Sequence, residues 1–141
     1  MNSIALKAPE KLYGAGKITT GPYPGFATDM QPQLASIMTM AEGETIVEET
    51  VFENRFGYAK ELIKMGADIE IFRRIAIIKG NGFLTGTRVK APDLRGGAAL
   101  VLAGLAAKGE TVIENIEFIE RGYCCFHKKL EKLGADIKRC I

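Results

Sequence analysis

The sequence predicts an α/β fold in which the helices are buried inside and the sheets lie outside. Two observations support this expectation. The chain repeats one plan of helix, strand, helix and strand, and the segment 98–107, AALVLAGLAA, is apolar on every side. A helix without a polar face has to be buried all round, and this one is too short to cross a bilayer. Helices that coat a sheet from outside usually keep one polar face, so this segment favours the opposite arrangement.

The repeat is visible in two long stretches. EGETIVEETVFENRFGYAKELIKMGADIEI begins at Glu42, and KGETVIENIEFIERGYCCFHKKLEKLGADIKR begins at Lys108. The spacing that separates Gly43 from Gly109 also separates Arg55 from Arg121. Similarity of this length indicates one supersecondary unit used twice, the first over about 17–80 and the second over about 83–141.

Each unit is expected to contain the same elements. Upstream of the two stretches, TDMQPQLASIMTMA matches PDLRGGAALVLAGLAA, which pairs Asp29 with Asp93 at the cap or first turn of a helix. Glycines at equivalent positions are expected to end the helices: Gly43, Gly66, Gly109 and Gly134. The helices are predicted at 28–41, 57–65, 93–107 and 122–133. The strands are predicted at 17–21, 45–52, 67–72, 75–80, 111–118 and 135–140, the last without a partner because the chain stops at position 141.

Composition sets limits on the function. With 141 residues, of which 47% are hydrophobic and 26% charged, the chain is expected to form one globular domain or a piece of a larger one. A net charge of +2 gives no reason to expect nucleic acid or membrane partners but is compatible with small anionic ligands. Cys124, Cys125 and Cys140 form neither a CxxC pair nor a disulfide framework, so we expect a reducing cytoplasm. No metal or organic cofactor is implied.

The joint between strand and helix in TVFENRFGYAKEL, at 50–62, carries the first candidate site residue. Arg55 stands where a helix begins, and a helix N-terminus favours anions. Arg121 stands at the equivalent joint of the second unit, so two guanidinium groups are expected to face one cleft. The other interpretation, an exposed surface charge, stays open for both. For Asp29 a helix cap, and for Arg95 an ion pair with Asp93, are the alternatives.

Several motifs in order resemble a known family. FATDMQPQ, ETVFENRF, MGADI, DLRGGAALVLAGLAAKGETV and ERGY are similar to the C-terminal part of the UDP-N-acetylglucosamine 1-carboxyvinyltransferases, which are enolpyruvyl transferases, from about Pro22 onward. The resemblance implies an inside-out α/β barrel, or prism, of which this chain carries two βαβαββ-type units. It also implies transfer of the enolpyruvyl group of phosphoenolpyruvate to the 3'-hydroxyl of UDP-N-acetylglucosamine, with release of phosphate, in cytoplasmic peptidoglycan precursor synthesis.

The resemblance also assigns roles to residues. It implies that Asp29 contacts the acceptor hydroxyl and is a candidate general base. It places the backbone of Val51, with Phe52 beside it, against the nucleotide sugar. The arginines of the motifs, Arg55, Arg95 and Arg121, are implied to bind phosphate or carboxylate groups, and Asp93 to fix the DLR segment.

Two departures and one absence qualify this picture. The family generally has alanine or small polar residues where this chain has Gly96 and Gly97, and polar residues where it has Cys124, Cys125 and Phe126. The family's catalytic cysteine and active-site lysine belong to the other, N-terminal half, so the chain alone is expected to be inactive and to have an exposed apolar face that favours dimers. The alternatives are a relative of 3-phosphoshikimate 1-carboxyvinyltransferase and a non-catalytic anion-binding or scaffold domain.

Overall fold

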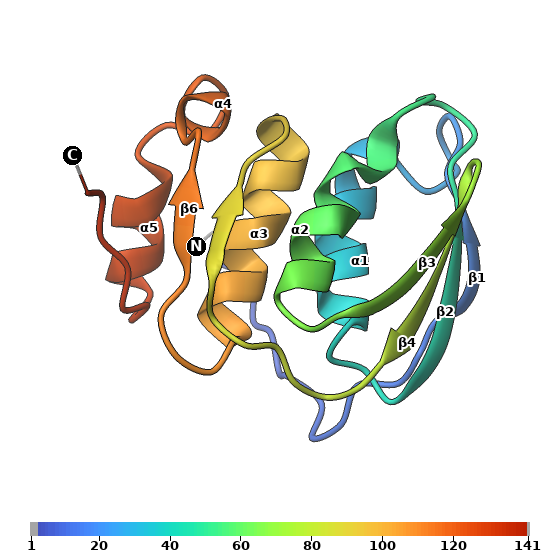
Figure 1. Ribbon diagram of the computed structural model, residues 1–141, viewed down its shortest axis with the longest axis horizontal. Helices are drawn as coiled ribbons and strands as arrows, with labels where there is room; N and C mark the ends of the chain where they lie inside the picture. Colours follow the sequence, from blue (N-terminus) through green and yellow to red (C-terminus); the bar gives the residue numbers. More distant parts are fainter. Residues whose placement is uncertain (1–2, 141) are drawn as a thin grey trace.

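The computed structural model describes residues 3–140 and has an α/β fold. Figure 1 shows a four-stranded sheet on one side, a two-stranded sheet on the other, and helices α1, α2 and α3 between them. The two sheets do not close a barrel within the described residues. Across residues 3–140, no helix is both long and apolar enough to cross a membrane.

The larger sheet has the strand order β1-β2-β4-β3. Its strands are β1 (Gly16–Thr19), β2 (Gly43–Glu48), β3 (Asp68–Phe72) and β4 (Ile75–Gly80). β1 runs parallel to β2, with Gly16 opposite Thr45, whereas β4 is antiparallel to both β2 and β3. The smaller sheet pairs β5 (Arg88–Lys90) with β6 (Val112–Glu114) in parallel. Each parallel pair is connected through a helix, as a crossover requires.

The helices follow the expected apolar patterns with shorter spans. They are the 3-10 helix η1 (Thr28–Met30), α1 (Gln31–Met38), the 3-10 helix η2 (Arg55–Tyr58), α2 (Ala59–Lys64), α3 (Leu94–Ala106), α4 (Glu117–Glu120) and α5 (Phe126–Lys132). α2 ends at a glycine as predicted: Gly66 has φ +94°, and the amide of Ala67 donates to the Leu62 carbonyl at 3.1 Å. Gly43 and Gly109 also have positive φ, but each lies beyond the end of its helix and leads toward a strand, so they are not helix caps.

α3 is the apolar helix at the centre of the molecule. It contacts α1, α2, η2 and β6, and its residues 96–101 are buried. Its C-terminal end is less enclosed, since Leu105 is 40% exposed. Within the segment 98–107, the expectation of burial on every side therefore holds for 98–101 and is wrong for the C-terminal end.

The second unit departs furthest from the sequence prediction. The helix expected at 122–133 begins only at Phe126, because Cys125 adopts a left-handed conformation (φ 49°) before it. Leu133, the last residue of that expected helix, is 83% exposed. The segment 135–140 forms no strand, and no strand of the described chain lies beside it to supply hydrogen bonds. The strand expected at 111–118 ends at Glu114, and α4 follows.

Candidate functional site

A cavity of about 710 Å³ lies where the starts of several helices meet. Its lining comes from η1, the loop before η2, the start of η2, the start of α3 and the residue after α4. The lining residues are Asp29, Val51, Phe52, Glu53, Asn54, Arg55, Asp93, Leu94, Arg95 and Arg121. All seven residues nominated from the sequence are among them.

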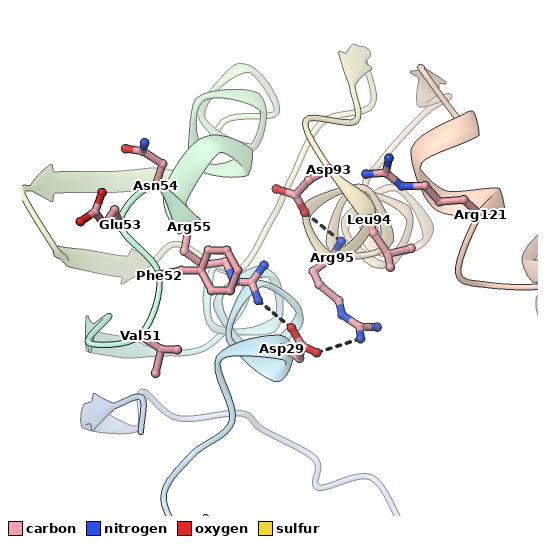
Figure 2. Close-up of a pocket in the computed structure, with 10 residues that line it drawn as sticks. All are labelled: Asp29, Val51, Phe52, Glu53, Asn54, Arg55, Asp93, Leu94, Arg95 and Arg121. Atoms are coloured by element: carbon pink, nitrogen blue, oxygen red, sulfur yellow. Dashed lines mark hydrogen bonds and ion pairs between the residues drawn. The ribbon is translucent and has the colours of Figure 1, made fainter. Parts of the chain in front are cut away.

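The carboxylate of Asp29 joins two arginines. Its Oδ1 accepts a hydrogen bond from Arg55 Nη2 at 2.7 Å, and its Oδ2 accepts one from Arg95 Nη2 at 2.8 Å, as Figure 2 shows. The hydrogen bond from Arg95 is the largest influence on the pKa of Asp29; desolvation works against it, but with Arg55 contributing the pKa is held below its ordinary value. Asp29 lies in the first turn of η1 but makes no capping hydrogen bond there.

Arg55 is held almost entirely inside the protein. The residue is 7% exposed, its Nε donates to Thr28 Oγ1 at 3.1 Å, and its guanidinium carbon lies 4.5 Å from the centre of the Phe52 ring. A buried guanidinium with a fixed ring on one face and a fixed acceptor on its edge has few orientations available. Arg55 therefore presents its charge to the cavity from a rigid position at the start of η2.

Glu49 organises this side of the cavity, and the sequence analysis missed it. The residue is 1% exposed; its Oε1 accepts from the amides of Val51 and Phe52 and from the Thr20 hydroxyl, each at 2.9 Å, and its Oε2 accepts from the Thr28 hydroxyl at 3.0 Å. Burial opposes ionisation, but these four donors outweigh it and lower the pKa of Glu49. The alternation of the strand could have predicted its burial, because residues 45, 47 and 49 all point inward.

Arg95 is positioned from two sides. The Asp93 side chain caps α3 by accepting from the amides of Arg95 and Gly96 at 2.9 and 2.8 Å, which fixes the backbone. The guanidinium does not pair with Asp93 and instead donates from Nη1 to the Tyr123 hydroxyl at 2.8 Å. That hydroxyl also accepts from Gln33 Nε2 at 3.3 Å. Tyr123 and Gln33 are further positioning residues that the sequence analysis did not identify.

Arg121 lines the same cavity from a different position than predicted. It follows the last residue of α4 and caps the C-terminus of that helix, so it does not stand at a helix N-terminus as Arg55 does. Its guanidinium carbon lies 4.9 Å from the centre of the Phe118 ring, and no carboxylate lies within ion-pair distance of it among residues 3–140. Figure 2 shows the side chain extending toward the start of α3 near Leu94.

Charge in the cavity is balanced but unevenly paired. The three arginines face three carboxylates in the lining, and Asp29 alone engages two of the arginines. Planar guanidinium groups bind phosphate and carboxylate through paired hydrogen bonds, so the arrangement can accept a small, multiply charged anion. Among residues 3–140, no group of three or more histidine, cysteine or acidic side chains is arranged to hold a metal ion.

Comparisons with known proteins identify the family of the chain. The family model described as EPSP synthase (3-phosphoshikimate 1-carboxyvinyltransferase) matches residues 1–130. UDP-N-acetylglucosamine 1-carboxyvinyltransferase 2 of Caldanaerobacter subterraneus subsp. tengcongensis is 56% identical over 124 residues, covering 88% of this chain and 30% of the relative. UDP-N-acetylglucosamine 1-carboxyvinyltransferase 1 of Clostridium perfringens is 51% identical over 138 residues, covering 98% and 32%. The chain thus spans about a third of the length of these curated relatives.

Solved structures give the same result for the fold. The enolpyruvyl transferase NikO from Streptomyces tendae superposes with a TM-score of 0.83 at 36% identity, covering 92% of this chain and 30% of NikO. EPSP synthase from Acinetobacter baumannii, at 21% identity and a TM-score of 0.54 over 76% of this chain and 24% of its own, shares the fold. The match to the family model over nearly the whole chain shows that the protein belongs to the EPSP synthase (3-phosphoshikimate 1-carboxyvinyltransferase) family of enolpyruvyl transferases.

Proposed function

We propose that this chain is part of a transferase that moves the enolpyruvyl group of phosphoenolpyruvate to the 3'-hydroxyl of UDP-N-acetylglucosamine, with release of phosphate. The observation that carries the proposal is the bridge of Asp29 between Arg55 and Arg95, with Arg121 on the same cavity. It combines a carboxylate that could take a hydroxyl proton with cations that could hold an anionic donor. The names of the relatives at more than 50% identity give the acceptor, UDP-N-acetylglucosamine, and the carboxyvinyl group that is transferred.

In this proposal the arginines hold the donor. Phosphoenolpyruvate carries a phosphate and a carboxylate, and addition to its enol carbon builds charge that fixed cations stabilise. Arg121, which has no carboxylate partner in the described chain, is available for such an anion at once. Arg55 and Arg95 become available as they exchange Asp29 for substrate oxygens. Val51 and Phe52, whose backbone amides are fixed by Glu49, would line the acceptor side.

Asp29 is the proposed base for the acceptor hydroxyl. Two guanidinium groups lower its pKa, which keeps it ionised but makes it a weak proton acceptor. When the donor's anionic groups take over Arg55 and Arg95, the Asp29 pKa rises toward its ordinary value and proton transfer becomes more favourable. Binding of the donor would thereby strengthen the base that acts on the acceptor.

The remainder of the enzyme is also part of the proposal. We propose that this chain supplies two units of an inside-out prism, and that the N-terminal half contributes the catalytic cysteine and the lysine. The two units proposed here extend over about 17–80 and 83–141. The chain alone would bind ligand weakly and would not turn over. The complete enzyme would act in the cytoplasm without a metal or organic cofactor.

A hollow of about 970 Å³ beside the end of α3 supports the idea of a missing structural partner. Its apolar lining includes Val101, Leu105, Ile113 and Ile116. Apolar surface of this kind is usually covered. In the complete enzyme the next unit of the domain would cover it, and in the isolated chain a second copy would. Light scattering that finds a strictly monomeric, folded chain at all concentrations would remove the second part of this proposal.

The alternatives make different predictions for ligand choice. A relative of 3-phosphoshikimate 1-carboxyvinyltransferase would bind a phosphorylated cyclic acid in place of a nucleotide sugar. Because the family model carries the name of that enzyme, shikimate 3-phosphate is one of the ligands tested. The identity of 21% to a solved EPSP synthase, against more than 50% to the nucleotide-sugar enzymes, argues against it. A non-catalytic anion-binding domain would bind phosphate without preference for either acceptor.

The test is a titration monitored by NMR of the arginine Nε–H groups. The chain is titrated with UDP-N-acetylglucosamine, shikimate 3-phosphate, phosphoenolpyruvate and inorganic phosphate. The proposal predicts that the nucleotide sugar and phosphoenolpyruvate shift the signals of Arg55 and Arg95. It also predicts that Arg55→Ala weakens binding of phosphoenolpyruvate at least tenfold, and that Asp29→Ala weakens binding of the nucleotide sugar but not of phosphoenolpyruvate, because loss of Asp29 frees the two arginines. Arg88→Ala is the matched control, because Arg88 is exposed and pairs with Glu114 away from the cavity. Equal affinity in all four proteins would refute the site.

A further inference from the structure

Two adjacent cysteines lie next to the support of Arg95, outside the cavity. Cys124 and Cys125 form part of the turn between α4 and α5; both are free and exposed, and their Sγ atoms are 3.8 Å apart. Cys125 has a left-handed backbone (φ 49°, ψ 43°), so the pair is not part of a helix. We propose that Cys124 and Cys125 are a reversible thiol–disulfide site that changes the position of Arg95 through Tyr123. The inference does not depend on the proposed transferase activity.

The chemistry needs only a small-molecule disulfide or a peroxide as oxidant. With a disulfide, one cysteine thiolate attacks a sulfur of the oxidant, forms a mixed disulfide and releases one small thiol. The neighbouring thiolate then attacks the protein sulfur, forms the Cys124–Cys125 bond and releases the second small thiol. The protein loses two protons and two electrons, and the oxidant is reduced to two thiols. A dithiol reductant reverses both steps.

The positions of the two residues favour ring closure and make the product easy to reduce. The two Sγ atoms already lie 3.8 Å apart, so the thiols need no large movement to meet. However, adjacent Cα atoms across a trans peptide are about 3.8 Å apart, below the roughly 4.4–6.8 Å of ordinary disulfides. The ring is therefore strained, and strained, exposed disulfides are the ones that exchange reversibly. Closing it requires the backbone of the turn to move.

That turn also holds a residue of the cavity. Tyr123, immediately before Cys124, accepts the hydrogen bond from Arg95 at 2.8 Å, and its ring stacks on Phe126 with centroids 5.0 Å apart. Both ring partners therefore flank the cysteine pair in sequence. A backbone rotation between them cannot leave the stacked rings and the hydroxyl position unchanged together. Among the described residues, Arg55 is linked to this turn through Asp29 and Arg95, so its signal should change less than that of Arg95.

The first experiment measures closure of the ring. The chain is equilibrated in mixtures of reduced and oxidised glutathione, and the peptide that contains both cysteines is weighed by mass spectrometry. We expect that peptide to lose two hydrogens, the free thiols per chain to fall from three to one, and dithiothreitol to restore them. Cys140→Ser, which removes the third exposed thiol, should behave as the wild type at the pair. Cys124→Ser and Cys125→Ser should give only mixed disulfides or linked chains.

The second experiment measures the effect on the cavity. In the closed form we expect the Arg95 Nε–H signal to shift and the Arg55 signal to shift less, both in the wild type and in Cys140→Ser. Oxidation of Cys124→Ser should leave the Arg95 signal less affected than closure does. The proposal fails if the wild-type peptide carries only glutathione adducts or interchain bonds. Its second part fails if the ring closes and the Arg95 signal does not move.

Discussion

Replacement of Glu49 tests whether this residue organises the cavity. Glu49→Ala removes the acceptor of the amides of Val51 and Phe52 and of the hydroxyls of Thr20 and Thr28. A hydrogen bond to a charged group contributes about 1.5–3 kcal/mol, and a buried donor left without a partner costs about 1–3 kcal/mol. The four contacts do not add, because the hydroxyls can rotate to new acceptors. We therefore expect a loss of about 3–5 kcal/mol in unfolding free energy.

Glu49→Gln removes the negative charge of the side chain and keeps its size and one oxygen acceptor. The amide oxygen can still accept from Val51 and Phe52, but the NH₂ group must face Thr28 Oγ1, which already accepts from Arg55 Nε. The Thr28 hydroxyl proton then has no acceptor at Glu49. We expect a loss of about 1–2 kcal/mol, which is smaller than for alanine because the backbone amides stay paired.

Equilibrium unfolding in urea, with midpoint and slope both measured, gives the comparison. Glu48→Gln is the matched control, because Glu48 is the preceding residue in the chain and its carboxylate pairs with Lys17 at the surface. Loss of this exposed pair should reduce the unfolding free energy less than either change at Glu49. Because the Glu49 pKa is lowered in the folded state, its stabilisation is present above the ordinary pKa of 4.5 and is lost as the pH falls through the lowered value. Glu49→Gln should flatten that decline. An alanine variant within about 0.5 kcal/mol of the wild type would refute the reasoning.

Three further changes test the site and the core. By carbon NMR titration, the Asp29 carboxyl should show a pKa below 3.8, and that pKa should rise in Arg95→Ala. The ion pairs of Asp29 therefore stabilise the fold above its ordinary pKa, and this stabilisation is lost as the pH falls through the lowered pKa. An unchanged pKa in Arg95→Ala would contradict the bridge. Leu100→Ala, at a fully buried position of α3, should cost about 2–5 kcal/mol in urea unfolding, and a loss below about 1 kcal/mol would mean that α3 is not enclosed. Gly97→Ala places a Cβ 2.6 Å from Ile119 Cγ1 and should cost about 1–3 kcal/mol in urea unfolding despite better helix propensity; a stabilised variant would refute the close packing.

The first unit was predictable because its signals are local. Leu62 and Met65 are spaced for one helix face and both are fully buried, and Gly66 supplies the positive φ that ends the helix. The strand residues of β4 pair with β2 and β3 in one sheet, where β-branched residues pack well. Local propensity and tertiary packing agree in this part of the chain, so the sequence pattern was enough to predict the secondary structure.

The second unit was harder because a strand needs a partner that its own residues do not encode. ADIEIF forms β3 alongside β4, whereas ADIKRC at 135–140 has similar letters and no neighbouring strand in the described chain. The expected helix at 122–133 also failed at its start, because Cys125 adopts a left-handed turn that no periodicity indicates. Equal sequence patterns therefore gave unequal structures where their neighbours differed.

The sequence predicted the charged residues that line the cavity but not the residues that position them. Motifs identified Asp29, Arg55 and Arg95, but the contacts that orient them come from Glu49 and Tyr123, which lie in the same motifs and were given no role. Tyr123 reaches Arg95 across 28 positions of sequence. Such contacts depend on how the helices pack, which the sequence pattern of a single segment cannot specify.

Asp29 links the two tasks of the proposed site. The carboxylate that would accept a proton is also the anion that holds two arginines in place when no ligand is bound. A donor that binds those arginines must displace Asp29, and each ion pair it breaks raises the affinity of Asp29 for protons. The same exchange works in reverse: protonation of Asp29 frees the arginines, so anion binding should strengthen as the pH falls toward the Asp29 pKa, until the ligand itself is protonated. Under the proposed function, donor binding and activation of the base are therefore one linked equilibrium.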